Sequence, residues 1–214
     1  IKSDIIVFGL GVFTFIVFTL WYVFRKLIWI VIPISSCFFS VLIMMGFLGI
    51  MNWKVTVISS NFIALMLILT MAMNIHMSTR FLQLKKKFPS SSLLEIVTLT
   101  TEKMVWPIVY TVLTTMCAFM SLVFSGIKPI IDFGLMMSFG LLTSFFVTFT
   151  LLPTLLNLFR YQEVEVEEKS FSSFTYLLSK LSINNVKLIT FISVLLVILS
   201  IFGISKLKVE NSFI

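Results

Sequence analysis

Residues 57 to 79, VISSNFIALMLILTMAMNIHMST, form the apolar run that decides what kind of protein this chain is. His76 is the only ionisable side chain in the run, which is followed directly by Arg80. A bilayer core about 30 Å thick needs about 20 mostly apolar residues per helix, because backbone polar groups cannot stay unpaired in lipid. The run therefore predicts a helix that crosses a membrane.

Other segments of the chain repeat this pattern. They lie near residues 4–24, 28–50, 104–125, 130–158 and 187–205. Hydrophobic residues make up 59% of the chain, charged residues 12%, and the mean hydropathy is +1.11, which excludes a water-soluble domain. We expect an all-α membrane protein with a six-helix transmembrane bundle, bent at Pro153, which falls in the last third of its helix.

The basic residues indicate the orientation of these helices. Three of the connections hold 11 of the 16 lysines and arginines, and by the positive-inside rule these connections are cytoplasmic. We therefore interpret the net charge of +7 as a topology signal and expect no nucleic-acid partner. This orientation makes the first helix enter from outside, so at least one further span is expected before Ile1.

The same pattern predicts how the chain is organised. Residues 1–159 are expected to form a five-helix transmembrane bundle, and residues 186–205 a further transmembrane helix. Residues 160–185 are expected to form a cytoplasmic linker and an amphipathic surface helix, because apolar residues share one helical face over 171–181. Residues 206–214 would begin an extracytoplasmic domain. Ser92 and Glu95 form a capping box that starts a helix leading into the fourth span.

Nothing in the sequence has the pattern of a catalytic centre. There is one histidine, no acidic pair at membrane depth, no phosphate-binding glycine loop and no metal-ligand spacing, so we expect neither an enzyme nor a cofactor or metal site. Cys37 and Cys117 lie in apolar runs and are interpreted as small buried hydrophobes.

Small and hydroxyl-bearing residues are candidates for helix contacts. We expect four glycines to serve helix packing or a hinge: Gly46, Gly49, Gly134 and Gly140. A series of hydroxyls precedes Pro153 and would satisfy the carbonyls that this proline frees; it consists of Thr143, Ser144, Thr148 and Thr150.

A family resemblance appears in the longest of these motifs. TVLTTMCAFMSLVFSGIKPIIDFGLMMSFGLLTSFFVTFTLLPTLL, residues 111 to 156, resembles the fifth and sixth transmembrane helices of the resistance-nodulation-division (RND) superfamily, in particular its MMPL-like and sterol-sensing-domain-like exporters. SDIIVFGLG, from residue 3, is similar to that family's second helix, and SSNFIALMLILTMAMNIHMSTRF, from residue 59, to its fourth. SKLKVENSFI, from residue 205, is similar to the start of its second large extracytoplasmic domain. The resemblance implies helices two to seven of a twelve-helix transporter, most of one half of its membrane domain.

The resemblance also implies a proton relay, from which this sequence departs. In the family a carboxylate at the middle of helix four takes up and releases the proton; that position falls on Ala72, and no Asp or Glu replaces it in the segment. Three alternatives remain open: the other half carries the coupling, the protein acts without a proton relay, or His76 and Asn74 serve instead. His76 is interpreted either as an interfacial polar residue or as a coupling group, and Asn74 as an interhelical hydrogen-bond donor.

The expected function follows from this resemblance. It implies a multi-pass transporter of the inner (plasma) membrane that exports hydrophobic or amphiphilic substrates such as lipids or drugs. The alternative is a sterol-sensing-like, lipid-binding or scaffold module without proton-coupled transport. The expected partners are the lipid bilayer, the substrate and the missing second half of the same chain, with a second copy or envelope proteins left open.

Overall fold

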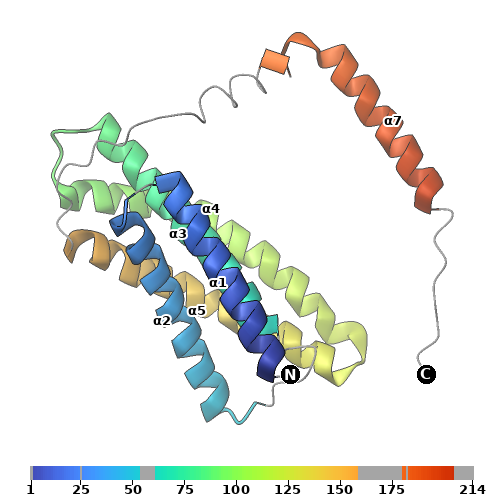
Figure 1. Cartoon of the computed structure of the whole chain (residues 1–214), viewed down its shortest axis with the longest axis horizontal. Helices are drawn as coiled ribbons and strands as arrows, with labels where there is room; N and C mark the ends of the chain where they lie inside the picture. Colours follow the sequence, from blue (N-terminus) through green and yellow to red (C-terminus); the bar gives the residue numbers. More distant parts are fainter. Residues whose placement is uncertain (1, 25, 54–60, 159–179, 182, 205–214) are drawn as a thin grey trace. The chain divides into compact units, whose positions relative to one another are not determined.

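The computed structural model describes residues 2–24, 26–53, 61–158, 180–181 and 183–204, and none of these residues lies in a β-strand. The helices are α1 (Lys2–Phe24), α2 (Ile28–Ile50), α3 (Phe62–Lys87), α4 (Leu93–Met120), α5 (Lys128–Leu158) and α7 (Val186–Ile204), shown in Figure 1. A short 3-10 helix, η2 (Ser121–Ser125), follows α4. The described chain is therefore all-α, as the sequence predicts.

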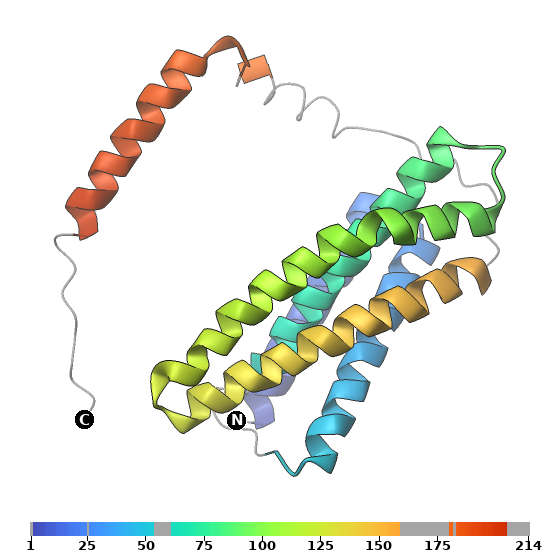
Figure 2. The same ribbon diagram turned by 180° about the vertical axis from the view of Figure 1, so that it is seen from behind.

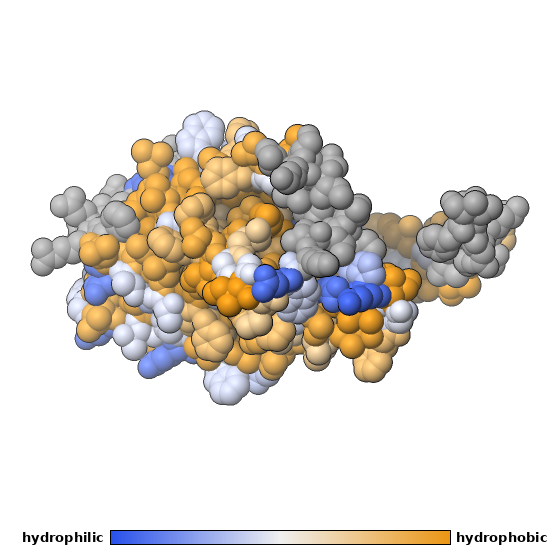
Figure 3. Space-filling model, turned by 90° about the horizontal axis from the view of Figure 1, so that it is seen from below, coloured by the Kyte–Doolittle hydropathy of each residue, from blue (hydrophilic) through white to orange (hydrophobic). Residues whose placement is uncertain are grey.

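Most of these helices have the length and composition of membrane spans. Five helical stretches of the described chain qualify: Ile28–Ile50, Phe62–Lys87, Leu93–Ser125, Lys128–Leu158 and Val186–Gly203. In α1 the shorter stretch Gly9–Tyr22 is apolar. Large hydrophobic side chains cover the outside as well, and Figure 3 shows one such face. An apolar exterior of this extent suits lipid rather than water, and the chain is a multi-pass membrane protein.

The chain divides into two compact units, residues Ile1–Val164 and Glu165–Ile214. The first contains α1 to α5, and the second contains α7. Within the first unit, α2, α3 and α5 pack against one another, α1 packs against α2 and α3, and α4 packs against α3 and α5. Figure 2 shows α4 and α5 as an antiparallel pair joined at η2. α3 packs against each of the other four helices and is therefore the central helix of this bundle.

The end of α3 departs from the sequence expectation, whereas the start of α4 follows it. The third helix continues to Lys87, two turns past the expected end at 79, because lysine, glutamine and leucine are good helix formers that a hydropathy pattern does not detect. The capping box is present: Glu95 N–H donates to Ser92 Oγ at 3.2 Å and Ser92 N–H donates to Glu95 Oε2 at 3.1 Å. It begins one continuous helix that becomes the fourth span.

Some expected features lie outside the described residues. They are the start of the third span at 57–60, most of the linker and amphipathic segment at 160–185, and the terminal stretch 206–214. Pro153 lies inside α5, which continues as a helix to Leu158.

Candidate functional site

The three residues of α3 singled out from the sequence occupy two opposite faces of the helix. Asn74 is fully buried, whereas Ala72 and His76 are exposed. Successive residues of an α-helix are rotated by about 100°, so residues two apart lie on nearly opposite faces. The structure therefore brings Asn74 into the interior and leaves Ala72 and His76 on the outside of the bundle.

Asn74 joins α3 to α2 through both ends of its amide. Ser36 Oγ donates to Asn74 Oδ1 at 3.1 Å. Asn74 Nδ2 donates to the Pro33 carbonyl at 3.4 Å and to Cys37 Sγ at 3.4 Å. The interhelical hydrogen bonding expected of Asn74 is therefore present, and its partners come from one face of α2.

Thr70, one turn before Asn74, joins α3 to α5. Its hydroxyl donates to the Met66 carbonyl at 2.7 Å and lies 2.6 Å from the Ser144 hydroxyl. Because the Thr70 hydroxyl has a single proton, its bond to Met66 leaves Ser144 as the donor in the second bond. The same face of α3 thus bonds to α2 at Asn74 and to α5 at Thr70.

Thr70 and Asn74 belong to a larger set of buried polar side chains, which we call the polar column. Each member is at most 1% exposed, none is charged, and all lie on α2, α3 or α5. The column consists of Ser36 and Ser40, Thr70, Asn74 and Ser78, and Ser144 and Thr148. On each helix its members are spaced four residues apart, which keeps them on one face.

Two contacts define how α2 is aligned with α3. Ser36 meets Asn74 through the hydrogen bond above. Nearly two turns further along both helices, Trp29 meets Phe81, with ring centroids 5.8 Å apart. From the first contact to the second, the residue numbers rise along α3 and fall along α2, so the two helices run antiparallel.

Two further contacts align α3 with α5. Thr70 meets Ser144, as described above. Four residues earlier on both helices, Met66 Sδ lies 3.5 Å from where a Cβ on Gly140 would be. Because the numbers rise together, these two helices run parallel.

The column therefore has levels spaced by a helical turn. The first level holds Ser40, Thr70 and Ser144, and the next holds Ser36, Asn74 and Thr148. Ser78 follows one turn further along α3. The hydroxyls of Ser40, Ser78 and Thr148 have no hydrogen-bond partner within the part of the chain that the structure describes.

The sequence interpretation missed most of the column. It assigned Ser144 and Thr148 to carbonyls freed by Pro153, whereas Ser144 bonds across to α3 and Thr148 has no partner among the described residues. The signal that would have found the column is the four-residue spacing of small polar residues in three separate apolar segments. Each pair alone is unremarkable, and only their coincidence on three helices predicts a shared interior face.

The candidate glycines also differ from one another. A Cβ on Gly134 would lie 2.5 Å from the Phe119 carbonyl oxygen, and one on Gly140 would lie 3.2 Å from the ring of Phe62. Gly46 and Gly49 have nothing within 4 Å at that position. Gly134 and Gly140 therefore permit close helix contacts, whereas Gly46 and Gly49 mediate none among the described helices.

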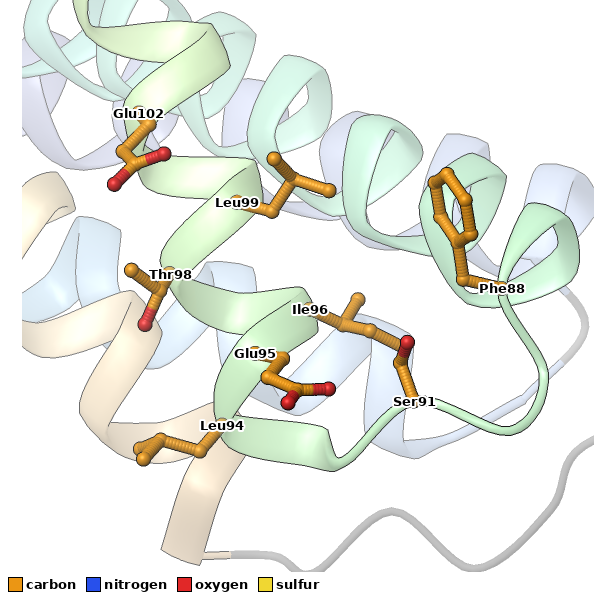
Figure 4. A pocket seen from close by; sticks show the side chains of 8 residues that line it. All are labelled: Phe88, Ser91, Leu94, Glu95, Ile96, Thr98, Leu99 and Glu102. Atoms are coloured by element: carbon orange, nitrogen blue, oxygen red, sulfur yellow. The ribbon is translucent and has the colours of Figure 1, made fainter.

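A cavity of about 450 Å³ lies apart from the column, at the start of α4 (Figure 4). Its lining combines apolar side chains with the carboxylates of Glu95 and Glu102. Glu95 already caps α4 through its bond to Ser92 N–H, so one of the two carboxylates is engaged in holding the helix start. The cavity thus belongs to the α3–α4 connection, and Asn74, Ala72 and His76 do not line it.

The chemistry of the column is that of neutral hydrogen-bonding groups. No cluster of three or more His, Cys, Asp or Glu side chains suited to a metal occurs among the described residues. Neither Asp nor Glu is present anywhere in α3. Hydroxyl and amide groups can bind neutral polar molecules and can exchange hydrogen-bond partners, but they do not release protons near neutral pH.

Comparison with protein families, curated proteins and solved structures finds no match for this chain. The resemblance to the RND superfamily therefore stays an expectation from the sequence motifs. The assignment of the column as the candidate site rests on its burial and its contacts.

Proposed function

We propose that this chain is part of the membrane domain of an RND-type transporter that exports hydrophobic or amphiphilic molecules, such as lipids or drugs, from the inner membrane. The observation that carries the proposal is the polar column in the interior of a mostly apolar bundle. The helix motifs of the sequence support the superfamily.

Burial of the column argues for more than structural support. A polar group in a membrane interior costs free energy unless it is hydrogen-bonded, and apolar side chains of similar size would pack the same helices. Three hydroxyls of the column have no partner in the described chain, which a purely structural interface would avoid. Polar groups that are costly and incompletely paired inside a membrane mark candidate functional sites.

The column also supplies a mechanism for such a change. Alternating access moves one group of helices against another around a site within the membrane. Hydroxyl hydrogen bonds, such as Ser144 to Thr70, can pass to a neighbouring hydroxyl one turn away when α3 shifts along its axis. A shift of α3 against α2 and α5 would therefore exchange partners within the column instead of breaking a packed apolar interface.

The proposal does not place the proton relay of the transporter in this chain. The family position of the proton-carrying aspartate is Ala72, which faces outward, and the inward-facing polar residue of α3 is the amide Asn74. An amide cannot take up and release a proton near neutral pH. We therefore assign any proton relay of the transporter to the second half of its membrane domain.

A second candidate function is a lipid-binding or scaffold module without transport, favoured by the absence of a carboxylate from α3. The two candidates differ in whether substrate moves. Its partners would be the bilayer lipids, other membrane helices or a second copy of the chain.

The test uses the protein in proteoliposomes loaded with a fluorescent amphiphile, with Asn74→Leu and Ala72→Leu as a matched pair. We expect efflux above that of liposomes without protein. This efflux should be lost in Asn74→Leu and kept in Ala72→Leu, because only Asn74→Leu disrupts the column. Efflux equal to that of liposomes without protein for every variant would contradict transport. Retained binding of the amphiphile without efflux would favour the lipid-binding module.

A further inference from the structure

We propose that the polar column binds ordered water molecules at the hydroxyls of Ser40, Ser78 and Thr148. This inference concerns the interior of the bundle and holds whatever the protein transports. The observation behind it is that these side chains are fully buried and have no hydrogen-bond partner in the described part of the chain.

The three hydroxyls differ from the others in these helices. Serine and threonine in a membrane helix can donate to a carbonyl one turn earlier in the same helix. Many in this chain do so, on exposed and buried faces alike, including Thr14, Thr100, Thr111, Ser138, Thr150, Thr154, Thr190 and Ser200. Ser40, Ser78 and Thr148 make no such bond. Their hydroxyls are therefore not satisfied by their own backbone.

Each of the three has other polar members of the column within about one helical turn. Ser40 shares a level with Thr70 and Ser144. Thr148 shares a level with Asn74, and Ser78 follows Asn74 by one turn. Buried water in proteins makes about three hydrogen bonds to groups that would otherwise be unsatisfied. The column supplies that setting, with donors and acceptors on three helices and no charged group to attract an ion.

The energetics favour occupation by water. A buried hydroxyl without a partner loses its hydration and gains nothing in return, whereas a bridging water restores most of the lost hydrogen bonding. Because the unpaired hydroxyls occur at successive levels, the waters would form a discontinuous chain that alternates with direct bonds such as Thr70 to Ser144.

Water-edited solid-state NMR of the full chain in lipid bilayers tests the proposal directly. Magnetisation starts on water and builds up on nearby side chains labelled with ¹³C at serine and threonine. We expect build-up several-fold faster at Ser40, Ser78 and Thr148 than at Ser138. Ser138 is the matched control, because it is buried on α5 and its hydroxyl donates to the Gly134 carbonyl at 2.9 Å. Equal build-up at all four positions would overturn the proposal.

Substitutions give a second measurement, in which the change in Tm differs between sites that hold water and sites that are dry. If water is bound, Ser40→Ala and Thr148→Val should lower the Tm by about 2–4 °C and reduce the water signal of the neighbouring column residues. If the sites are dry, the same changes remove an unpaired polar group and should leave the Tm unchanged or raise it. Ser138→Ala controls for the loss of a buried hydroxyl. A variant that fails to fold is replaced by the NMR measurement on the unsubstituted chain.

The same samples distinguish water from a bound cation. Replacing sodium chloride by choline chloride should leave both the Tm and the NMR build-up unchanged. A Tm that depends on sodium would overturn the assignment to water, because the ligand would then be an ion held by the column oxygens.

Discussion

Helices α3 and α4 are both long and apolar, yet their polar side chains bond in different ways. The apolar window of α3 is 50% buried, and that of α4 is 11% buried. On α4, Thr111, Thr114 and Thr115 each donate to a carbonyl of their own helix. On α3, Thr70 and Asn74 bond to neighbouring helices.

The difference shows that the structural role of a hydroxyl in a membrane helix depends on the face on which it lies. On a face toward lipid, the backbone of the same helix is the available partner, so the hydroxyl adds no contact between helices. On an interior face, it can hold two helices together or remain without a protein partner. Substitutions on the two helices should therefore differ in effect, and each variant below tests that difference.

The largest effect is expected at Gly134, where α5 lies close against α4. In Gly134→Ala the new Cβ would lie 2.5 Å from the Phe119 carbonyl oxygen, so the backbones must separate. We expect a loss of stability of about 3 kcal/mol, the upper end for overpacking. Thermal unfolding followed by labelling of the buried Cys37 measures it, with Cys117→Ala as background because Cys117 is exposed and not buried as its apolar sequence context predicts. Gly46→Ala is the control, with open space at its Cβ; equal Tm values for both variants would refute the close contact.

A smaller loss is expected on removing the amide of Asn74. Asn74→Leu keeps the side-chain size but deprives Ser36 and Pro33 of their partner. The expected loss is about 1.7 kcal/mol, the upper end measured for interhelical hydrogen bonds in membranes. A double-mutant cycle with Ser36→Ala measures how much of it belongs to that pair, and strictly additive effects would show that the two side chains do not interact.

The threonines compare the two helices directly. Thr70→Val removes a bond to α5, and we expect a loss of about 0.6 kcal/mol, the average for such bonds. Thr114→Val removes bonds only to its own helix and should change stability less. The same labelling assay ranks the pair. A larger effect at Thr114 would reverse the distinction drawn between α3 and α4.

The smallest effect is expected at His76. Its side chain is exposed on the face of α3 opposite Asn74, so His76→Ala should change stability by less than about 0.5 kcal/mol. In proteoliposomes the efflux rate and its pH profile should match those of the unsubstituted protein. A changed pH profile at unchanged stability would make His76 a coupling residue after all.

Sequence patterns predicted most of the fold because lipid imposes a length and a composition on each span. The expected segment 28–50 coincides with α2, and the capping box at Ser92 begins α4 as expected. The extension of α3 to Lys87 was missed, because a polar helix end resembles a loop in hydropathy.

The candidate site was less predictable. Asn74 and His76 are equally conspicuous in an apolar run, and their two-residue separation shows only that they face apart. Which one faces inward depends on where α2 and α5 lie, and that is a property of tertiary packing. For the same reason Gly46 and Gly134 resemble one another as sequence but differ in their surroundings.

The four-residue spacing of the polar column bears on how the protein assembles. Apolar helices in lipid have little reason to prefer one neighbour to another, because lipid tails contact them as well as other helices do. The polar side chains of α3 form one face whose levels match those of its neighbours. α2 packs against this face antiparallel to α3, and α5 packs against it parallel to α3. Inserting a single residue within α3 before Thr70 would rotate that face by about 100° relative to the start of the helix. In the unaltered chain, the column would select, during membrane insertion, which helices pack against α3, although these helices are far apart along the chain.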